Sequence, residues 1–442
     1  MSQDQLADLS RLLYSPTTLL LYISAAFVYL YALTTTVGRR EERERGRRAR
    51  RVGGVLAVFG ITAHVAHEIV RGLAQDRLPL GNMFEVTSLM ALVGVVVGLS
   101  YLQFSRRRPE LNGFVLLGGA LVLGMAMLMY SEPGPLMPIL DTWWRPFHVS
   151  LLVAAMGIFA AAFVFNSLYL LRDTAERTVA AERARPGAGS TVGAAYIGDL
   201  AGDTDTVADG EGSASAPSTS VPAAAGRTAS GAVRDDRDQH QGRDQDHGRG
   251  QDHGRGQDQD RDPDEERERK ELLAYHAALR AGVSPVKLAI GTFLGTALVS
   301  WVWLVTADTL AAGLTRFLAV NLTMVAAALL ARWFVPFLPS TATMDGLAHR
   351  TTAFAFVMWT VGTIAGAMWA EVSWGRFWGW DPKETGAFLT WIAYAGYLHA
   401  RATRGVKGRG AAWIGIGAFI VLMGTYLIAN YVIVGLHSYA DL

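Results

Sequence analysis

The sequence contains no cysteine among its 442 residues. A chain without cysteine forms no disulfide, performs no thiol exchange and offers no thiolate to a metal. Any redox chemistry on cysteine thiols must therefore belong to other proteins. The sequence also lacks a basic segment before its first apolar run, which follows Pro16 and is long. We interpret this run as a membrane span and not as a cleaved signal.

Net charge is also nearly absent: the formal value is +1, and Arg and Lys fall in clusters between long apolar runs. Such clusters report membrane topology and do not indicate a nucleic-acid partner. Hydrophobic residues make up 51% of the chain, although the stretch 173–286 is almost entirely polar. Because about 20 apolar residues span a bilayer, the recurring runs predict an all-α, polytopic transmembrane bundle of about ten helices. A soluble globular protein is excluded.

The predicted spans cover residues 17–36, 52–70, 86–104, 112–130, 147–171, 287–306, 317–335, 352–371, 386–402 and 411–434. Placing the basic residues 39–51 in the cytoplasm puts the N-terminus outside, and the remaining basic loops then also fall inside. The outer segments are 71–85, 131–146, 307–316, 372–385 and the tail from Gly435. The sequence thus predicts a multi-pass plasma-membrane protein with an external C-terminus.

The polar stretch divides the chain into three predicted regions: N-terminal membrane helices (1–172), an insert (173–286) and C-terminal membrane helices (287–442). The insert has few large apolar residues and a near-repeat, QDHGRGQDHGRGQDQDRD, at 245–262. It cannot bury a core, so we predict a disordered cytoplasmic linker in which only 265–279 has helical character.

The densest chemical signal is WGRFWGWDPKETGAFLTW, residues 374–391. It holds more large aromatic side chains than an interfacial belt of anchors needs. If its first part is helical, Trp374, Phe377 and Trp378 share one face, and Pro382 then opens the next helix. The expected result is a flat aromatic shelf at the outer surface. A porphyrin, which is flat and apolar with two carboxylates and an iron, suits such a shelf.

Two histidines lie on the same predicted side as this shelf: His148 at the start of the fifth span and His437 after the tenth. Imidazole is a good axial ligand for haem iron, so a bis-histidine site is the natural hypothesis. The alternative for each is an ordinary hydrogen-bonded interfacial histidine. His399 falls at the inner end of the ninth span, where it either interacts with the helix C-terminus or serves as an inner haem ligand.

A further histidine pair, His64 and His67, shares one helix face within the second predicted span. Buried intramembrane histidines are functional candidates, but these two lie too far from the inner end to pair with His399. Glu68 beside them could equally make a local polar contact.

The Trp-rich segment, the downstream YLHAR and the final GLHSYA together resemble the CcsA/ResC family of cytochrome c biogenesis proteins, sometimes labelled CcsB in actinobacteria. Similar motifs are RLPLGNMFE, WRPFHV and the run 338–370. This resemblance implies a system II cytochrome c synthetase subunit with a haem-binding "WWD" segment, which contains Trp374, Trp378, Trp380 and Asp381. It also implies that His148 and His437 are the external ligands of the haem iron and that His399 is the membrane-embedded histidine.

The resemblance further implies partners and a cargo: a ResB-like membrane protein, an apocytochrome c with a CXXCH motif, a thioredoxin-like thiol reductant acting indirectly, and haem b. No catalytic acid or base is expected, which leaves enzymatic activity in a haem lyase open. Two features depart from the family pattern: Gly386 stands where another Trp is usual, and the insert is extra. The rival functions are a haem exporter or chaperone without ligation activity, and an ordinary solute transporter with Trp anchors.

Overall fold

The computed structural model describes residues 2–36, 40–105, 108–134, 142–184, 263–433 and 435–436. Contacts divide the chain into two units, residues 1–189 with 276–442, and residues 190–275. The first unit contains the membrane helices. Of the second, the described part is the beginning of one helix, which carries exposed ion pairs one turn apart, Arg267–Glu271 and Lys270–Glu266.

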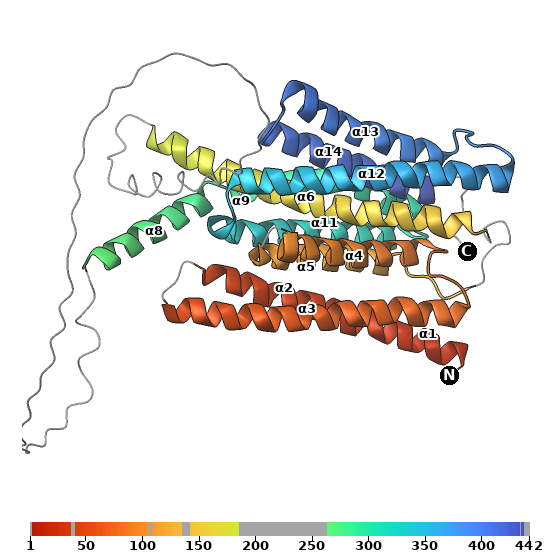
Figure 1. Cartoon of the computed structure of the whole chain (residues 1–442), viewed down its shortest axis with the longest axis horizontal. Helices are drawn as coiled ribbons and strands as arrows, with labels where there is room; N and C mark the ends of the chain where they lie inside the picture. The colour runs from red at the N-terminus through yellow and green to blue at the C-terminus, as the bar shows by residue number, and fades with distance from the viewer. Residues whose placement is uncertain are drawn as a thin grey trace, which may run out of the picture. The chain divides into compact units, whose positions relative to one another are not determined.

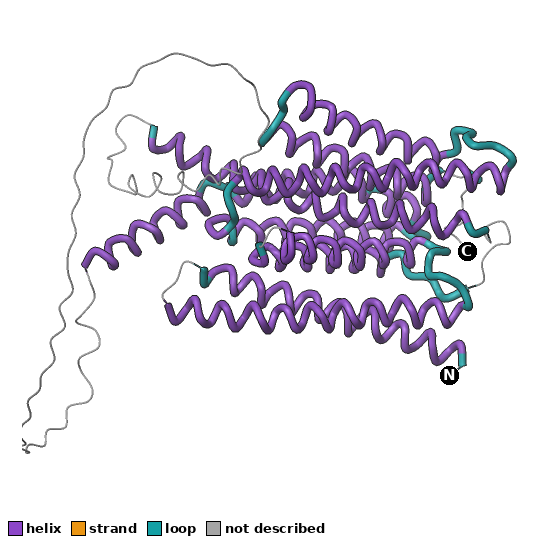
Figure 2. The backbone as a smooth tube through the Cα atoms, in the orientation of Figure 1, coloured by secondary structure: helices purple, strands orange, loops and turns teal. Residues whose placement is uncertain are grey.

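Regular structure in the described residues is helical throughout (Figure 2). The helices are α1 (Gln3–Leu12), η1 (Leu13–Thr18), α2 (Leu19–Thr34), α3 (Arg40–Gln75), α4 (Met83–Ser100), η2 (Tyr101–Ser105), η3 (Pro109–Leu111), α5 (Asn112–Met127), α6 (Trp144–Arg183), α8 (Pro263–Ala281), α9 (Pro285–Ser300), α10 (Val302–Thr306), α11 (Leu310–Trp333), η5 (Val335–Phe337), α12 (Thr341–Trp374), α13 (Pro382–Arg404) and α14 (Arg409–Tyr431).

Each of the ten predicted spans overlaps helices of the structure, with 287–306 covering both α9 and α10, so the all-α polytopic prediction is confirmed. Eight helical segments of the described chain are long and apolar enough to cross a membrane. The other two predicted spans correspond to α5, which is a shorter apolar helix, and α13. Both ends of α13 carry charge, with Lys383 and Glu384 in its first turn and Arg401 and Arg404 in its last. By its helix composition the chain is a multi-pass membrane protein.

The helices of the first unit run roughly along one direction, with α6 and α12 in extensive contact (Figure 1). Other close pairs are α2 with α3, α13 with α14, and α9 with α11. We call the end that holds the loops 76–82 and 375–381 the tryptophan end. The opposite end, with residues 40–51 and 401–409, is the arginine end. This alternation agrees with the predicted order of loops.

Large apolar side chains are exposed on the outer faces of several helices at three- and four-residue spacing. On α9 they include Ile290, Leu294 and Leu298. A helix face of this composition suits a lipid environment, in which hydrocarbon replaces protein as the partner.

Two boundaries of the polar insert can be compared with the structure. Helix α6 continues to Arg183, beyond the predicted boundary at residue 172, and α8 contains the helix predicted at 265–279. Residues 185–262, which include the repeat and His240, His247 and His253, lie outside the described residues.

Candidate functional site

His148 lies at the start of the second turn of α6 and packs against α12. Its Nδ1 is 2.7 Å from the carbonyl oxygen of Gly362, and its ring is 6.0 Å from that of Trp369 at an interplanar angle of 23°. Gly366, between those two residues, makes the contact possible, because a Cβ atom there would lie 2.5 Å from Cε1 of the imidazole. The two helices therefore hold the ring in a fixed position.

The bond to Gly362 also selects a tautomer of His148. A carbonyl oxygen only accepts hydrogen bonds, so Nδ1 carries the proton and the lone pair of the ring is on Nε2. Metal-bound histidines are held in the same way, with one ring nitrogen donating to a carbonyl or carboxylate and the other bound to the metal.

The aromatic cluster begins with Trp369, which is buried and lies 5.0 Å from Trp374. Helix α12 ends at Trp374 because Gly375 adopts φ 68°, a left-handed conformation that glycine tolerates and that terminates a helix. The expected shared helical face is therefore wrong: Phe377 and Trp378 lie in the loop that follows. The prediction that Pro382 opens the next helix is confirmed.

A second aromatic group comprises Trp378, Trp380 and Phe388. Their ring centroids are 5.7 to 6.2 Å apart and the ring planes meet at 77° to 90°. They do not form one flat shelf, since edge-to-face packing turns each ring across its neighbour. Trp380 is 64% exposed and has φ 59°, which is unusual for a residue other than glycine. Such strained positions often occur at ligand sites.

Glu384 holds the loop that presents Trp380. Its Oε2 accepts hydrogen bonds from the backbone N–H groups of Gly379 at 2.7 Å and Asp381 at 3.2 Å. Its other oxygen pairs with Arg376 at 3.1 Å. One buried carboxylate thus binds the backbone on both sides of Trp380 and offsets its conformational strain.

The loop 76–82 is built by the same means. Glu85 is fully buried, pairs with Arg71 at 3.1 Å and Arg77 at 2.9 Å, and accepts from the backbone of Gly81 at 2.8 Å. These bonds stabilise the charged form of the buried carboxylate. Arg145, three residues before His148, donates to the carbonyl oxygen of Leu80. The RLPLGNMFE motif, whose role could not be read from sequence, therefore anchors the start of α6.

Asp381 joins the Trp-rich segment to the tail after α14. It caps α13 in a reciprocal capping box with Glu384, and its Oδ1 accepts from the backbone N–H of Leu436 at 2.7 Å. Leu436 is the residue before His437, which itself lies outside the described residues. Asp381 is thus a positioning residue for the tail.

Cationic groups also lie in this region. Arg376 is committed to Glu384, with its guanidinium carbon 5.8 Å from the centre of the Trp374 ring. Lys383 is in the first turn of α13, and burial lowers its pKa from 10.5 to about 8, while the nearby Asp381 opposes that shift. An anionic ligand beside Lys383 would favour its charged form.

His399 is far from this cluster. His399 is exposed near the end of α13, seventeen residues after Pro382. At 1.5 Å per residue this is about 26 Å along the helix from the Trp-rich loop. It therefore belongs to the arginine end, as predicted.

His64 and His67 are completely enclosed in protein, at 0% and 1% exposure. His64 contacts Tyr22 at 3.1 Å and Ser88 at 3.0 Å through its two ring nitrogens, and Ser88 donates to Glu68 at 2.7 Å. Both nitrogens of His64 are therefore occupied. The sequence allowed a local polar contact for Glu68, and the structure contains one, with Ser88.

Gly386, the departure from the family pattern, lies where α13 packs on α14. A Cβ atom there would be 3.0 Å from Cβ of Thr425. The residue is buried, so the close approach of these helices depends on the missing side chain.

Residues 282–437 match the family model described as "Cytochrome C assembly protein". This part of the chain is similar to that family. It includes α9 to α14 and the Trp-rich loop, so the Trp-rich segment and YLHAR lie within the matched region, which ends inside GLHSYA at residue 437.

The same region is similar to curated proteins named "Cytochrome c biogenesis protein CcsA". The chain is 46% identical over 96 residues to the protein of Synechococcus sp. (strain RCC307), with 22% of this chain and 31% of the relative aligned. It is 47% identical over 96 residues to that of Prochlorococcus marinus (strain MIT 9312), covering 22% and 31%. For Guillardia theta the values are 47% over 97 residues, covering 22% and 32%. The chain spans about a third of these relatives' length.

Proposed function

We propose that this protein is the membrane subunit of a system II cytochrome c synthetase that presents haem b for covalent attachment to an apocytochrome c. The single observation that carries the proposal is the convergence of three segments at the tryptophan end. His148 contacts Trp369, which contacts Trp374, and Asp381 binds the backbone of Leu436 next to His437. His148 and Leu436, the residue before His437, thus both connect to the Trp-rich segment.

Haem is the substrate of this site. His148 and His437 would coordinate its iron, exposed Trp380 and Phe377 would contact the porphyrin, and Lys383 would pair with a propionate. His399 would receive haem at the opposite end, together with a ResB-like partner. With the basic loops in the cytoplasm, the tryptophan end would face the outside of the plasma membrane.

In the ligation step, each cysteine S–H of a CXXCH motif adds across one vinyl C=C bond of haem. The sulfur bonds to one vinyl carbon and the proton goes to the other, so no oxidant is consumed. The protein's residues orient the haem and need not act as acid or base. A thioredoxin-like reductant would keep the substrate thiols reduced.

The test uses purified protein with its ResB-like partner, haem and a CXXCH apocytochrome. We expect covalent cytochrome to form, and we expect His148→Ala and His437→Ala to shift the Soret band, with partial recovery in exogenous imidazole. A haem exporter or chaperone, the second candidate, would give the same spectra without covalent product. Protein with no Soret absorption after haem addition would contradict both.

A further inference from the structure

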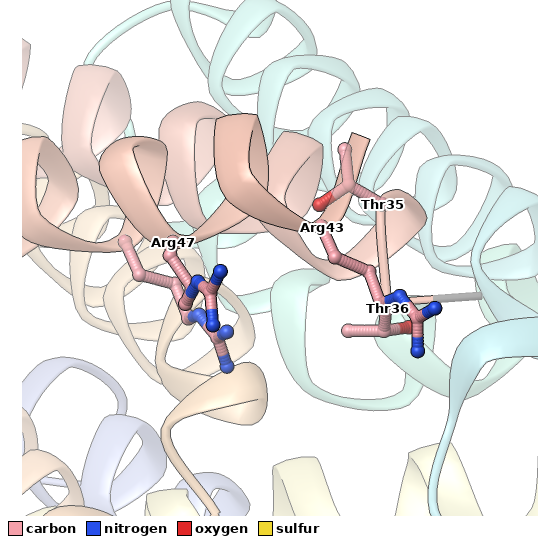
Figure 3. Close-up of a pocket in the computed structure, with 5 residues that line it drawn as sticks. Thr35, Thr36, Arg43 and Arg47 are labelled. Carbon is pink, nitrogen blue, oxygen red and sulfur yellow. The ribbon is translucent and has the colours of Figure 1, made fainter. Parts of the chain in front are cut away.

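A pocket at the arginine end has no role in the proposed haem site. It is lined by Thr35 and Thr36, at the end of α2, and by Arg43, Arg47 and Arg50 of α3. Figure 3 shows Arg43 and Arg47 on the same side of α3, with the Arg43 side chain extending toward Thr36. We propose that this pocket binds the phosphate group of an anionic membrane lipid.

The three arginines share one face of α3. Their spacing of four and three residues places them within about 60° around the helix axis. Arg47 has one ion pair in the described structure, a partly exposed contact of 3.6 Å with Glu44, and the ion-paired residues there do not include Arg43 or Arg50. Exposed pairs of this kind contribute only about 0–1 kcal/mol, so a phosphate can displace Glu44.

The wall opposite the arginines is held in place by close packing. Gly46 is buried, and a Cβ atom there would overlap Oγ1 of Thr35. The hydroxyls of Thr35 and Thr36 donate to carbonyl oxygens of α2. They therefore shape the pocket, and the guanidinium groups supply the donors, whose planar geometry suits phosphate oxygens.

The depth of the pocket favours a lipid over a soluble anion. The apolar part of α3 starts at Val52, so Arg50 and Arg47 lie about 3 and 7.5 Å beyond it along the axis. The headgroup layer on each side of a bilayer is about 5–7 Å thick, so Arg50 falls within it and Arg47 at its outer edge. Val58 is on the same face as Arg47 and is 64% exposed, which provides a surface for an acyl chain.

The chain offers a matched control, because Arg45 and Arg48 lie on the same helix but on a different face from the pocket. Removing either pair changes the net charge and the topology signal equally. The probe is spin-labelled phosphatidylglycerol, compared with spin-labelled phosphatidylcholine, in phosphatidylcholine vesicles containing the full chain. Electron spin resonance measures the fraction of each label that is immobilised by the protein.

We expect the wild type and Arg45→Gln/Arg48→Gln to immobilise phosphatidylglycerol preferentially, and Arg43→Gln/Arg47→Gln to lose the preference. If each arginine contributes about fivefold to the affinity for phosphatidylglycerol relative to phosphatidylcholine, the double variant should lose roughly 25-fold in relative affinity. Equal loss in both double variants would mean a diffuse basic field and would overturn the site. If both double variants keep the preference for phosphatidylglycerol, the proposed site is also wrong.

Two further measurements complete the test. If Arg43→Gln/Arg47→Gln does not fold, Arg43→Lys/Arg47→Lys keeps the charge and should still weaken the preference, since lysine lacks the bidentate geometry. Inorganic phosphate added at constant ionic strength should leave the preference unchanged. If phosphate abolishes it in the wild type, the pocket is filled from solution and the lipid assignment is wrong.

Discussion

The most direct test of the haem site is the replacement Gly366→Ala. The new Cβ would lie 2.5 Å from Cε1 and 2.7 Å from Nδ1 of His148, whereas ordinary contacts begin at 3.4 Å. The imidazole must then move by about 0.9 Å, the difference between 3.4 and 2.5 Å. This displacement can lengthen the 2.7 Å bond from Nδ1 to Gly362 to about 3.6 Å, beyond hydrogen-bond range.

The loss of a hydrogen bond that orients a metal-binding histidine typically lowers metal affinity about 10–100-fold. We expect Gly366→Ala to reduce haem affinity by that order and to broaden or shift the Soret band. The assay is an absorption titration of purified protein with haem. The variant keeps His148 itself, so added imidazole should restore less than it does in His148→Ala.

Gly98→Ala is the matched control. Its Cβ would lie 2.7 Å from Cγ1 of Val115, a similar overlap between α4 and α5 that does not involve His148. It should lower thermal stability without altering the haem spectrum. The reasoning is refuted if Gly366→Ala binds haem as the wild type does while His148→Ala does not. If neither variant changes binding, His148 is not an iron ligand.

Three other predictions concern the start of α13. Glu384→Gln should destabilise the protein by about 1–3 kcal/mol and alter the near-ultraviolet circular dichroism of Trp380, because the loop loses its anionic acceptor; unchanged dichroism would contradict this role. Lys383 has its pKa lowered to about 8, so the unfolded chain binds its proton more tightly and wild-type stability should rise from pH 8 toward 10.5. Lys383→Met should remove that rise in melting temperature, and an identical pH profile would disprove the assignment. Gly386→Trp should lower the free energy of unfolding by about 1–3 kcal/mol through overlap with Thr425, which thermal melting would detect, and a variant as stable as the wild type would show that α14 can move away.

Helix positions were predictable because a bilayer imposes a simple requirement. Each span must satisfy its own backbone hydrogen bonds, which requires a helix, and must present about 20 apolar residues. Runs of apolar residues of that length can be recognised in the sequence. Eight of the ten predicted spans meet this requirement in the described structure, and the other two correspond to α5 and α13. The helix after Pro382 follows from the absence of a backbone N–H group on proline.

The contacts of the candidate site were not predictable in the same way. The end of α12 depends on the left-handed conformation of Gly375, which a glycine permits but does not require. The roles of Gly362, Gly366 and Trp369 depend on which face of α12 meets α6. Their signal was the spacing of two small residues and one aromatic on one helix face, which also describes ordinary helix packing.

Sequence alone determined the membrane class, the approximate positions and order of the membrane helices, and the motifs that resemble the cytochrome c assembly family, because these depend on composition and local spacing. Tertiary structure decided which side chains meet. In the tertiary structure, His64 and His67 are buried and His148 packs against Gly366. Glu384 binds the backbone of the Trp-rich loop, and Asp381 binds the backbone of the tail. Such contacts join residues that are distant along the chain, and they depend on the rotation of each helix about its axis, which hydropathy does not specify.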